Sequence, residues 1–366
     1  MSKINVLYDH QTFSVQDYGG ISKCFTMYAK EFSDSFLNIN AHIGARFSGN
    51  HHYKEAFPGS FISIPKIPGS IRLKLFLNRL AMSFDSFKPD VIHPTFYFKK
   101  DLPMDDSIPM VNTVHDMTPE LYPEKFLKGN PHSAKREYCN KSRFVVCVSK
   151  KTKEDLIKFY GIKEEKIRVV YHGIDLQEAR NNYHVKQGLP KNFLLYVGKR
   201  SGYKNFTLLF EAFKCLTKTY SSLSLVCVGG GKFTESELFQ FEAAGLGNRI
   251  IQVSATDLEL RGMYQEAKAF IFPSLYEGFG IPILEAFAQK CPVVLSESSC
   301  FPEVAGEAAI YFDPDDLESC IKAIEKALSQ GSNALTRLGY KRAKEFTWQN
   351  AARSLASIYK EASDKY

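Results

Sequence analysis

The segment "FLLYVGKRSGYKNFTLLFEAFKCLTKTY" (residues 193–220) decides the fold class. Its first seven residues, 193–199, form an apolar run without polar alternation, which is typical of a parallel strand covered on both faces. A short polar turn follows, and residues 204–220 then have the amphipathic pattern of a helix. Strand, turn and helix in this order are the repeating unit of an α/β protein with a parallel sheet.

The same unit recurs along the chain. Further apolar runs predict strands at 4–8, 90–94, 110–116, 144–149, 167–173, 223–230, 249–254, 269–274 and 292–296. Helical patterns lie between them, for example at 20–32, 70–84, 150–161 and 258–268. Ser149 is a suitable N-cap for the helix at 150–161 and Gly161 a suitable stop. The repeat is too irregular for eight equivalent barrel units, so two Rossmann-like doubly wound sheets are predicted.

Two domains are expected, because a single core rarely grows beyond about 250–300 residues and this chain has 366. The polar, irregular stretch 172–192 separates two series of strand–helix units, so a boundary at 172/173 is predicted. Ligands of open α/β sheets bind at the carboxyl ends of the strands. A ligand cleft between the two domains is therefore expected.

Composition limits the class of protein. Hydrophobic residues make up 44% and charged residues 24%, as in soluble globular proteins. No apolar run reaches the roughly 18 residues that span a bilayer, and the N-terminus lacks a signal-peptide pattern. The eight cysteines include no CxxC pair, which favours reduced thiols in the cytoplasm. A net charge of +7 suits an anionic small substrate or an acidic membrane surface, but is too weak to indicate nucleic acid.

Gly19 and Gly20 lie between the first predicted strand and the helix that follows. A glycine pair here lets backbone amides approach a phosphate at the helix N-terminus. The same pair is also common in ordinary strand–helix turns, and the sequence leaves both interpretations open.

Two histidines lie at the carboxyl ends of predicted strands. His115 lies in "TVHD" (113–116), and His93 lies in "DVIHP" (90–94). At a strand's carboxyl end, a histidine can orient a hydroxyl group or accept its proton. Each could equally be a structural histidine with satisfied hydrogen bonds.

Arg200 and Lys204 follow the strand at 193–199, and a helix is expected to begin near Lys204 or Asn205. Two cations and a helix N-terminus that converge on one point suit a diphosphate. The alternative is a solvated turn.

The sequence "PSLYEGFGIPILEA" is the strongest local signal. It begins at Pro273 and contains Glu277 and Glu285 with seven residues between them. Pro282 suits a first helical turn, which places Glu285 about one turn into the helix. Two carboxylates in these positions can accept hydrogen bonds from several hydroxyl groups, although Glu285 alone could serve only to balance the helix dipole.

The loop between the two glutamates adds hydrogen-bond donors. The backbone amides of Gly278, Phe279 and Gly280 can reach the same ligand as the carboxylates. A ligand with many hydroxyl groups and an anionic centre is a nucleotide sugar, so the segment predicts a nucleotide-sugar site.

Together these segments resemble the retaining GT-B glycosyltransferases of family GT4. The most specific marks are "YVGKRSGYKNF", "VGGG" (228–231) and "FPSLYEGFGIPILEAFAQKCPVV", whose glutamates match an E-x7-E motif. "TVHD", "VVYHGID" and "FTWQNAARSLASIY" support the resemblance, which runs from about residue 4 to residue 360. The opening "YDHQTFSVQDYGGIS" is most similar to bacterial mannosyltransferases of polysaccharide and O-antigen clusters.

The resemblance implies roles for the candidate residues. Arg200 and Lys204 would bind the donor diphosphate, Glu285 the ribose hydroxyls, and Glu277 with the 278–280 amides the donor sugar. His115 would contact the sugar or assist the reacting face. The glycines that would let the donor approach the backbone are Gly19, Gly20, Gly198 and Gly230.

The resemblance also implies the domain assignment and the partners. Residues 1–172 would form the acceptor domain, 173–347 the nucleotide-sugar domain, and the helix at 348–366 would return to the first. The acceptor would be a glycan or a lipid-linked glycan, and oligomeric state is left open. The enzyme is expected in the cytoplasm, at the inner face of the membrane if it binds there.

The implied reaction is transfer of a hexose with retention, without a carboxylate nucleophile and without a metal. The acidic pairs 105–106 and 315–316 fall in expected surface loops. GDP-mannose is favoured as donor by resemblance alone, since no residue identifies the base. The alternatives are a nucleotide-sugar-binding protein without catalysis, and a GT-B epimerase.

The helix at 70–84 carries Arg72, Lys74 and Arg79 beside several large apolar residues. It could rest on an anionic membrane. The alternative is an ordinary first-domain helix with solvated cations.

Overall fold

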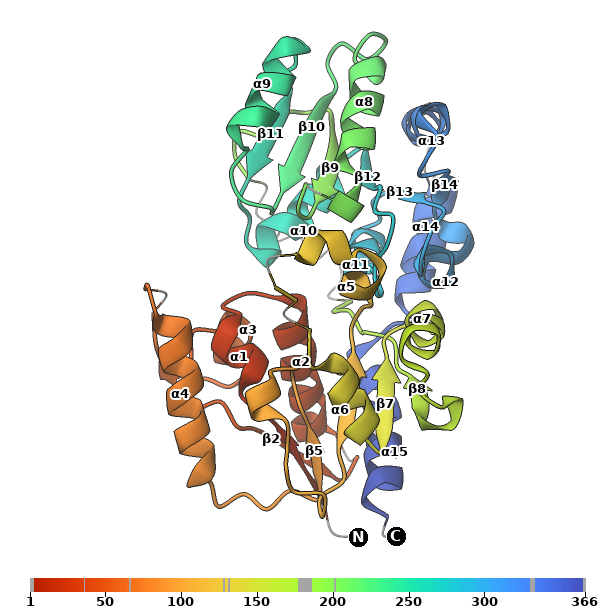
Figure 1. Cartoon of the computed structure of the whole chain (residues 1–366). Coiled ribbons are helices and arrows are strands. Elements are labelled where there is room, and N and C mark those ends of the chain that lie inside the picture. The colour runs from red at the N-terminus through yellow and green to blue at the C-terminus, as the bar shows by residue number, and fades with distance from the viewer. Residues whose placement is uncertain are drawn as a thin grey trace. The chain divides into compact units, whose positions relative to one another are not determined.

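The computed structural model describes residues 3–35, 37–65, 67–127, 129–130, 132–176, 186–200, 202–329 and 333–364. The chain divides into two compact units (Figure 1). The first unit comprises Met1–Gly173 and Trp348–Tyr366, and the second comprises Ile174–Thr347. The last helix therefore belongs to the first unit, and each unit is described by itself.

The first unit contains two three-stranded parallel sheets and a short parallel pair. The first sheet has the order β2 (Ile39–Ile43), β1 (Ile4–Tyr8), β5 (Val91–His93). The second has the order β6 (Val111–Val114), β7 (Phe144–Cys147), β8 (Ile167–Val169). A parallel bridge between Ile92 and Met110 connects them edge to edge. The pair is β3 (Phe47–Ser48) and β4 (Ile62–Ser63).

The helices of the first unit connect these strands. They are α1 (Gln11–Val15), α2 (Gly20–Asp34), α3 (His51–Ala56), α4 (Ser70–Ser83), α5 (Thr118–Leu121), α6 (Lys135–Lys141), α7 (Lys150–Tyr160) and α15 (Trp348–Ser363), with 3-10 turns at Lys99–Asp101, Pro123–Phe126 and Glu164–Lys166. The predicted cap of α7 is confirmed, because the Ser149 side chain accepts a hydrogen bond from the Thr152 amide at 3.0 Å. Gly161 ends the same helix.

Helix α15 is held to the first sheet by a buried hydrogen-bond chain. The Tyr359 hydroxyl lies 2.9 Å from the Tyr8 hydroxyl and 2.7 Å from His93 Nδ1. His93 Nε2 lies 2.8 Å from the Thr113 hydroxyl, so both ring nitrogens are satisfied. Burial lowers the pKa of His93 to about 3, which keeps the ring neutral. His93 is therefore a structural histidine.

The second unit is built on one six-stranded parallel sheet. Its order is β11 (Ile250–Val253), β10 (Ser224–Val228), β9 (Phe193–Val197), β12 (Ala269–Phe272), β13 (Val293–Ser296), β14 (Ile310–Phe312). Numbered within the unit, this order is 3-2-1-4-5-6, that of the doubly wound Rossmann sheet. The order reverses between β9 and β12, which is where such sheets bind ligands.

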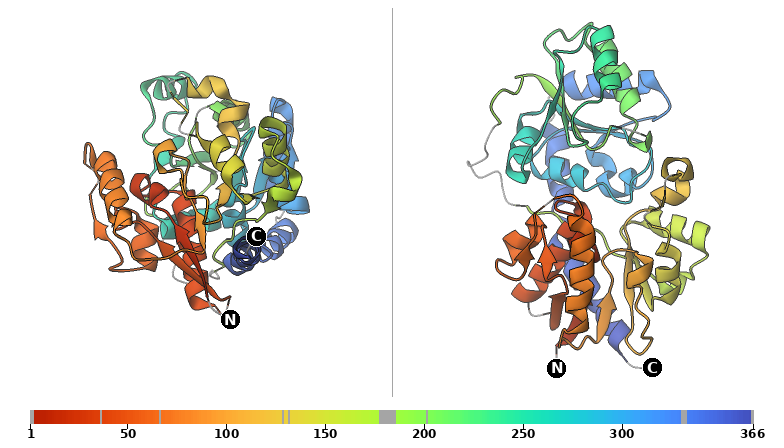
Figure 2. Two further views of the ribbon diagram at one scale, coloured as in Figure 1. Left: turned by 60° about the horizontal axis from the view of Figure 1, so that its bottom comes forward. Right: turned by 60° about the vertical axis from the view of Figure 1, so that its left-hand side comes forward.

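Helices cover both faces of this sheet (Figure 2). They are α8 (Phe206–Leu216), α9 (Glu235–Ala243), α10 (Asp257–Glu266), α11 (Ile281–Ala288), α12 (Phe301–Ala305), α13 (Leu317–Ser329) and α14 (Asn333–Ala343), with 3-10 turns at Gly202–Lys204 and Gly306–Ala308. On one face α8 and α13 pack on the strands, for example through Phe213 and Ile324. On the other face, Tyr264 of α10 and Phe301 of α12 contact Phe270 and Phe272 of β12.

Several predicted elements differ from the structure. The strands β2 and β14 were not expected. The helix expected over 204–220 is α8, Phe206–Leu216, and Lys204 instead ends a 3-10 turn. Within the polar stretch 172–192, residues 177–185 lie outside the described residues.

The predicted surface position of the α4 cations is wrong for Lys74, whereas the Arg79 side chain stays 37% exposed. Lys74 has a side chain only 1% exposed and pairs with Asp17 at 3.1 Å. Arg79 forms two hydrogen bonds to the buried carboxylate of Asp101, at 2.6 and 2.8 Å. Polar groups of α4 thus bind the protein, and Arg72 is left at the surface.

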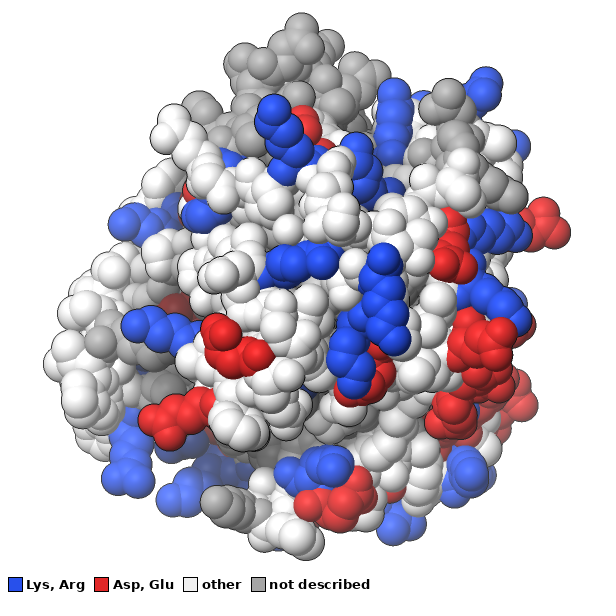
Figure 3. Space-filling view, turned by 90° about the horizontal axis from the view of Figure 1, so that it is seen from above, with Lys and Arg blue, Asp and Glu red and all other residues white. Residues whose placement is uncertain are grey.

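The structure can be compared with three expectations from the composition, which concern surface charge, membrane-spanning helices and cysteines. Lys and Arg side chains are scattered among acidic and uncharged ones over the face drawn in Figure 3. Among the helices in the described ranges, none is long and apolar enough to cross a bilayer. All eight cysteines are free thiols, and all but Cys215 are buried.

Candidate functional site

The loops after β9 and β12 meet where the strand order of the second unit reverses. Strand β9 ends at Val197 and leads into the loop that contains Lys204, while β12 ends at Phe272 and leads into the loop that contains Glu277. The Leu275 amide donates to the Tyr203 carbonyl at 2.7 Å, which joins the two loops. The site is thus built from segments some 70 residues apart in sequence.

Lys204 and Glu277 form an ion pair at this point. Lys204 Nζ lies 2.5 Å from Glu277 Oε1, and their side chains are 16% and 15% exposed. The Ser274 hydroxyl donates to the same carboxylate oxygen at 2.8 Å. The ammonium also lies 5.7 Å from the centre of the Phe272 ring. A partly exposed cation and carboxylate are therefore held side by side by defined neighbours.

The backbone at Glu277 is fixed by the segment that follows β13. The Ser299 hydroxyl donates to the Glu277 carbonyl at 2.7 Å and accepts from its amide at 3.2 Å. The Cys300 thiol lies 3.2 Å from the carbonyls of both Glu277 and Phe279. Sequence analysis missed Ser274, Ser299 and Cys300. Their only signal was their position after neighbouring strands of a parallel sheet.

The glycine-rich loop turns directly into α11. Gly280 has a left-handed backbone with φ of 91°, and a Cβ there would lie 2.9 Å from Ile283 Cδ1, so the turn requires glycine. Gly278 and Phe279 are buried beside it. Glu285 lies in the second turn of α11, as predicted, and accepts a 3.4 Å hydrogen bond from the Tyr264 hydroxyl.

Arg200 does not converge with Lys204. Its Nε lies 2.8 Å from Glu237 Oε1, and its two Nη atoms donate to the carbonyls of Gly229, Gly231 and Lys232 at 3.0–3.2 Å. Its side chain is 4% exposed. Because β9 lies between β10 and β12, Arg200 is directed to the loop after β10 and Lys204 to the loop after β12.

The contacts of Arg200 also change the pKa of Glu237, the carboxylate with which it pairs. Burial would raise the pKa of Glu237, but hydrogen bonds from Arg200 and Thr234 bring that pKa below its usual value. The pair is therefore ionised. It holds the glycine loop 229–231 in place, so the geometry gives Arg200 a positioning role, and direct contact of Arg200 with a diphosphate stays a prediction.

The loop 229–231 packs closely against the loop that follows β9. A Cβ at Gly230 would lie 2.9 Å from the Gly198 carbonyl oxygen and 2.8 Å from Arg200 Nη1, and its φ is 70°. The Gly198 amide donates to the Val228 carbonyl at 2.9 Å. Packing accounts for Gly230. Contact of Gly198 or Gly230 with a donor stays a prediction.

The remaining candidates lie in the first unit. His115 follows β6 and stacks on His172, with ring centroids 5.7 Å apart. Burial lowers the pKa of His115 to about 3 despite nearby Asp116, so its ring is neutral and can accept a hydrogen bond. Gly20 opens α2, and a Cβ there would meet nothing within 4 Å. A Cβ at Gly19 would meet the flexible Gln16 side chain. Their roles toward a donor stay predictions.

In the part of the chain that the structure describes, no group of three or more His, Cys, Asp or Glu side chains could hold a metal ion. Lys204 and Glu277 pair with each other, and the Ser274 hydroxyl donates to the same carboxylate. These side chains can supply hydrogen bonds and a positive and a negative charge at this edge. Independence of the reaction from metal stays a prediction.

Comparison with known families identifies the class. Residues 18–178 match "Glycosyltransferase Family 4" and residues 179–345 match "Glycosyl transferases group 1". The two matches follow one another and correspond closely to the two structural units. The chain belongs to the family 4 glycosyltransferases, and its fold is GT-B, with two Rossmann-like domains.

Individual relatives are similar at modest identity. "O-antigen chain mannosyltransferase B" of Escherichia coli is 26% identical over 308 residues, which cover 77% of each chain. "O-antigen chain mannosyltransferase RfbU" of Salmonella typhimurium is 29% identical over 242 residues, covering 64% of this chain and 66% of that protein. The structure of Anabaena Alr3699/HepE in complex with UDP and glucose has a TM-score of 0.71 at 18% identity, covering 98% of this chain and 100% of that one.

Proposed function

We propose that this protein is a retaining, metal-independent hexosyltransferase that moves mannose from GDP-mannose to a glycan or lipid-linked glycan. The observation that carries the proposal is the Lys204–Glu277 pair at the switch point of the second sheet, with Glu285 in the helix that follows. The mannosyltransferase relatives support the choice of sugar and a role in bacterial polysaccharide or O-antigen synthesis.

In the proposed reaction the bond between the sugar and the diphosphate breaks, and negative charge develops on the leaving oxygen. Lys204 stabilises that charge more in the transition state than in the ground state, which is where rate enhancement arises. Glu277 accepts hydrogen bonds from sugar hydroxyls, and Glu285 from the ribose. The acceptor hydroxyl attacks on the face that the diphosphate leaves and gives its proton to the departing phosphate.

Arg200 supports this chemistry indirectly. It fixes the loop 229–231 through three carbonyl groups, and that loop lies beside Gly198 at the end of β9. His115 assists from the first unit as a neutral acceptor, and Gly20 lets the phosphate approach the N-terminus of α2.

The test begins with thermal-shift screening against GDP, UDP, dTDP and their sugars, in which the correct donor raises Tm most. Turnover of that donor with a lipid-linked glycan follows, with and without EDTA, and NMR gives the anomeric configuration of the product. Retained configuration and full activity in EDTA are expected. Binding without turnover would instead indicate a non-catalytic protein, and an epimerised nucleotide sugar formed without acceptor would indicate an epimerase.

A further inference from the structure

His115 is held in its orientation by other rings. Its ring stacks on that of His172, with the centroids 5.7 Å apart and the planes inclined by 15°. It also lies edge to face against Phe25 of α2, with the centroids 6.1 Å apart. Within the described residues, no hydrogen bond is formed to its ring nitrogens. These ring contacts therefore set the direction of the His115 plane.

A histidine that acts on a substrate is commonly oriented by a hydrogen bond to one ring nitrogen. The adjacent carboxylate does not form that bond in the described part of the chain, because Asp116 accepts from the Thr118 amide at 2.9 Å. His93 shows the opposite case, since hydroxyl groups bind both of its ring nitrogens. Orientation by stacking leaves both nitrogens of His115 to a substrate.

His172 is itself fixed in place. The residue is 5% exposed, and its Nδ1 lies 3.1 Å from the Tyr28 hydroxyl and 3.3 Å from the Cys24 thiol, both on α2. Its ring also contacts that of Trp348 at the start of α15, with the centroids 6.5 Å apart. Burial lowers the pKa of His172 well below its usual value, so two neutral rings stack without charge repulsion. All of these residues belong to the first unit.

We propose that His172 is a positioning residue, which holds the plane of His115 toward the reacting sugar by ring stacking, with Tyr28 and Cys24 as its anchors. The proposal rests on the proposed function, in which His115 assists as a neutral acceptor. It assigns to His172 the orienting task that a hydrogen-bonded carboxylate performs for many other histidines. A flat side chain is what this position needs, and the nitrogens of His172 serve only to anchor it.

Steady-state kinetics with the full chain test the need for a ring. His172→Leu removes the ring, and His172→Gln also removes it but keeps a hydrogen-bond acceptor for Tyr28. Both should lower kcat about five- to tenfold, as expected for loss of one stacked pair, with little change in KM for the donor. His172→Phe keeps a flat ring and should restore kcat to within about twofold of wild type.

A double-mutant cycle separates positioning from a merely structural role. In a chain that already carries His115→Ala, His172→Gln should cause no further loss of kcat, because no imidazole is left to orient. Equal losses with and without His115 would overturn the proposal, and so would full kcat in folded His172→Gln.

NMR of ring protons tests the same relationship without turnover. The wild-type protein and His172→Phe should show an NOE between the His115 and Phe25 rings, and His172→Gln should weaken it. An undiminished NOE in His172→Gln would overturn the proposal. If the wild-type protein shows no transfer at all, the proposed function fails, while the NOE still decides whether His172 orients His115.

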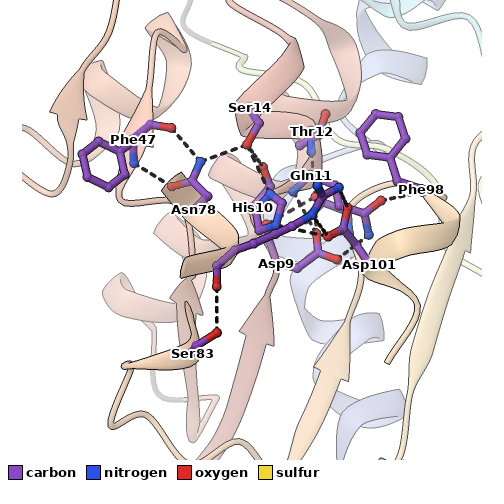
Figure 4. Close-up of polar contacts among 12 residues, drawn as sticks. Asp9, His10, Gln11, Thr12, Ser14, Phe47, Asn78, Ser83, Phe98 and Asp101 are labelled. Carbon is purple, nitrogen blue, oxygen red and sulfur yellow. Dashed lines mark hydrogen bonds and ion pairs between the residues drawn. The ribbon is translucent and has the colours of Figure 1, made fainter. Parts of the chain in front are cut away.

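Asn78→Ala is the control for loss of stability alone. The Asn78 side chain accepts from the Phe47 amide and donates to the Phe47 carbonyl, both at 2.8 Å, in a buried polar network of the first unit (Figure 4). This variant should lower Tm, yet it should leave the NOE of His115 and the kcat of the folded protein unchanged. A similar fall of kcat in Asn78→Ala would show that the His172 variants act through stability, which would overturn the proposal.

Discussion

Lys204 Nζ and Glu277 Oε1 lie 2.5 Å apart, although 73 residues separate them in sequence. They meet where the strand order of the second sheet reverses, at the carboxyl ends of β9 and β12. The pairing keeps a cation and a carboxylate in position at the edge where doubly wound sheets bind ligands. We expect the pair to separate when the donor binds. The Lys204 ammonium would then contact the donor diphosphate, and the Glu277 carboxylate would accept hydrogen bonds from the donor sugar.

Removal of the Lys204 ammonium should abolish most transfer. Lys204→Ala is expected to lower kcat about 100- to 1,000-fold, as loss of one fixed charge at a developing anion does. The free energy of unfolding should fall by no more than about 2 kcal/mol, because Ser274 still binds Glu277. Steady-state kinetics and urea unfolding check this. The control is Lys214→Ala, which removes a lysine of α8 that also pairs with a glutamate, Glu211, but lies outside the proposed site. Normal turnover in Lys204→Ala would refute the role.

Arg200→Ala should act mainly on stability. It leaves three loop carbonyls and Glu237 without their common donor, so the free energy of unfolding should fall by about 2–4 kcal/mol. Glu237→Gln, which keeps a hydrogen-bond acceptor, should cost less. An unchanged unfolding curve with complete loss of transfer would mean that Arg200 acts on the donor directly.

Alanine substitutions at Gly20 and Gly230 should distinguish an effect on transfer from an effect on stability. Gly20→Ala adds a methyl group where nothing lies within 4 Å, so stability should stay equal or rise by about 0.4–1 kcal/mol. Transfer should nevertheless fall, because the proposed reaction brings the donor phosphate close to the backbone at this position. Gly230→Ala should unfold more easily, since its φ is 70° and the Gly198 carbonyl is too close. Unimpaired kinetics in Gly20→Ala would remove that residue from the site.

The first unit should lose stability in acid through its buried histidines, which are His93, His115 and His172 and which all have a lowered pKa; His93 is the one to test. Burial lowers the pKa of the folded-state His93 imidazole to about 3, against an unfolded value near 6.5. The stability it contributes is therefore complete above pH 6.5 and is lost as the pH falls toward 3, at up to about 1.4 kcal/mol per pH unit.

His93→Asn should make the dependence of Tm on pH shallower between 6.5 and 5, even if it lowers Tm overall, and the buried His115 and His172 should account for the remaining slope. His51→Gln changes an exposed histidine and serves as control. A pH slope that is the same in His93→Asn and in wild type would assign the acid sensitivity to other groups.

The fold was predictable because its central strands are continuous apolar runs, which can be recognised from the local sequence alone. Residues 193–197 and 269–272 are fully buried or nearly so, and their sequence reflects it. Strand β2 was missed because it lies at a sheet edge, where Asn40 is exposed and the apolar run is broken. Strand β14 has three residues and also lies at an edge.

The site was predictable in part. Lys204 and Glu277 could be located because each follows a recognisable strand, and Glu285 because Pro282 marks the first turn of its helix. The direction of a side chain depends on its neighbours in space, so sequence could not show that Arg200 turns toward Glu237 and away from Lys204. The burial of Lys74 and the pairing of Arg79 with Asp101 were hidden for the same reason, because Asp17 and Asp101 are far from them in sequence.

Isothermal titration calorimetry of GDP-mannose with the wild-type protein and Lys204→Ala tests the central claim most directly. We predict saturable binding to the wild-type protein, and a Kd raised about 10- to 100-fold in Lys204→Ala, as expected for loss of a charge-assisted contact. An unchanged Kd in the variant would contradict the claim that the nucleotide sugar binds at the Lys204–Glu277 pair.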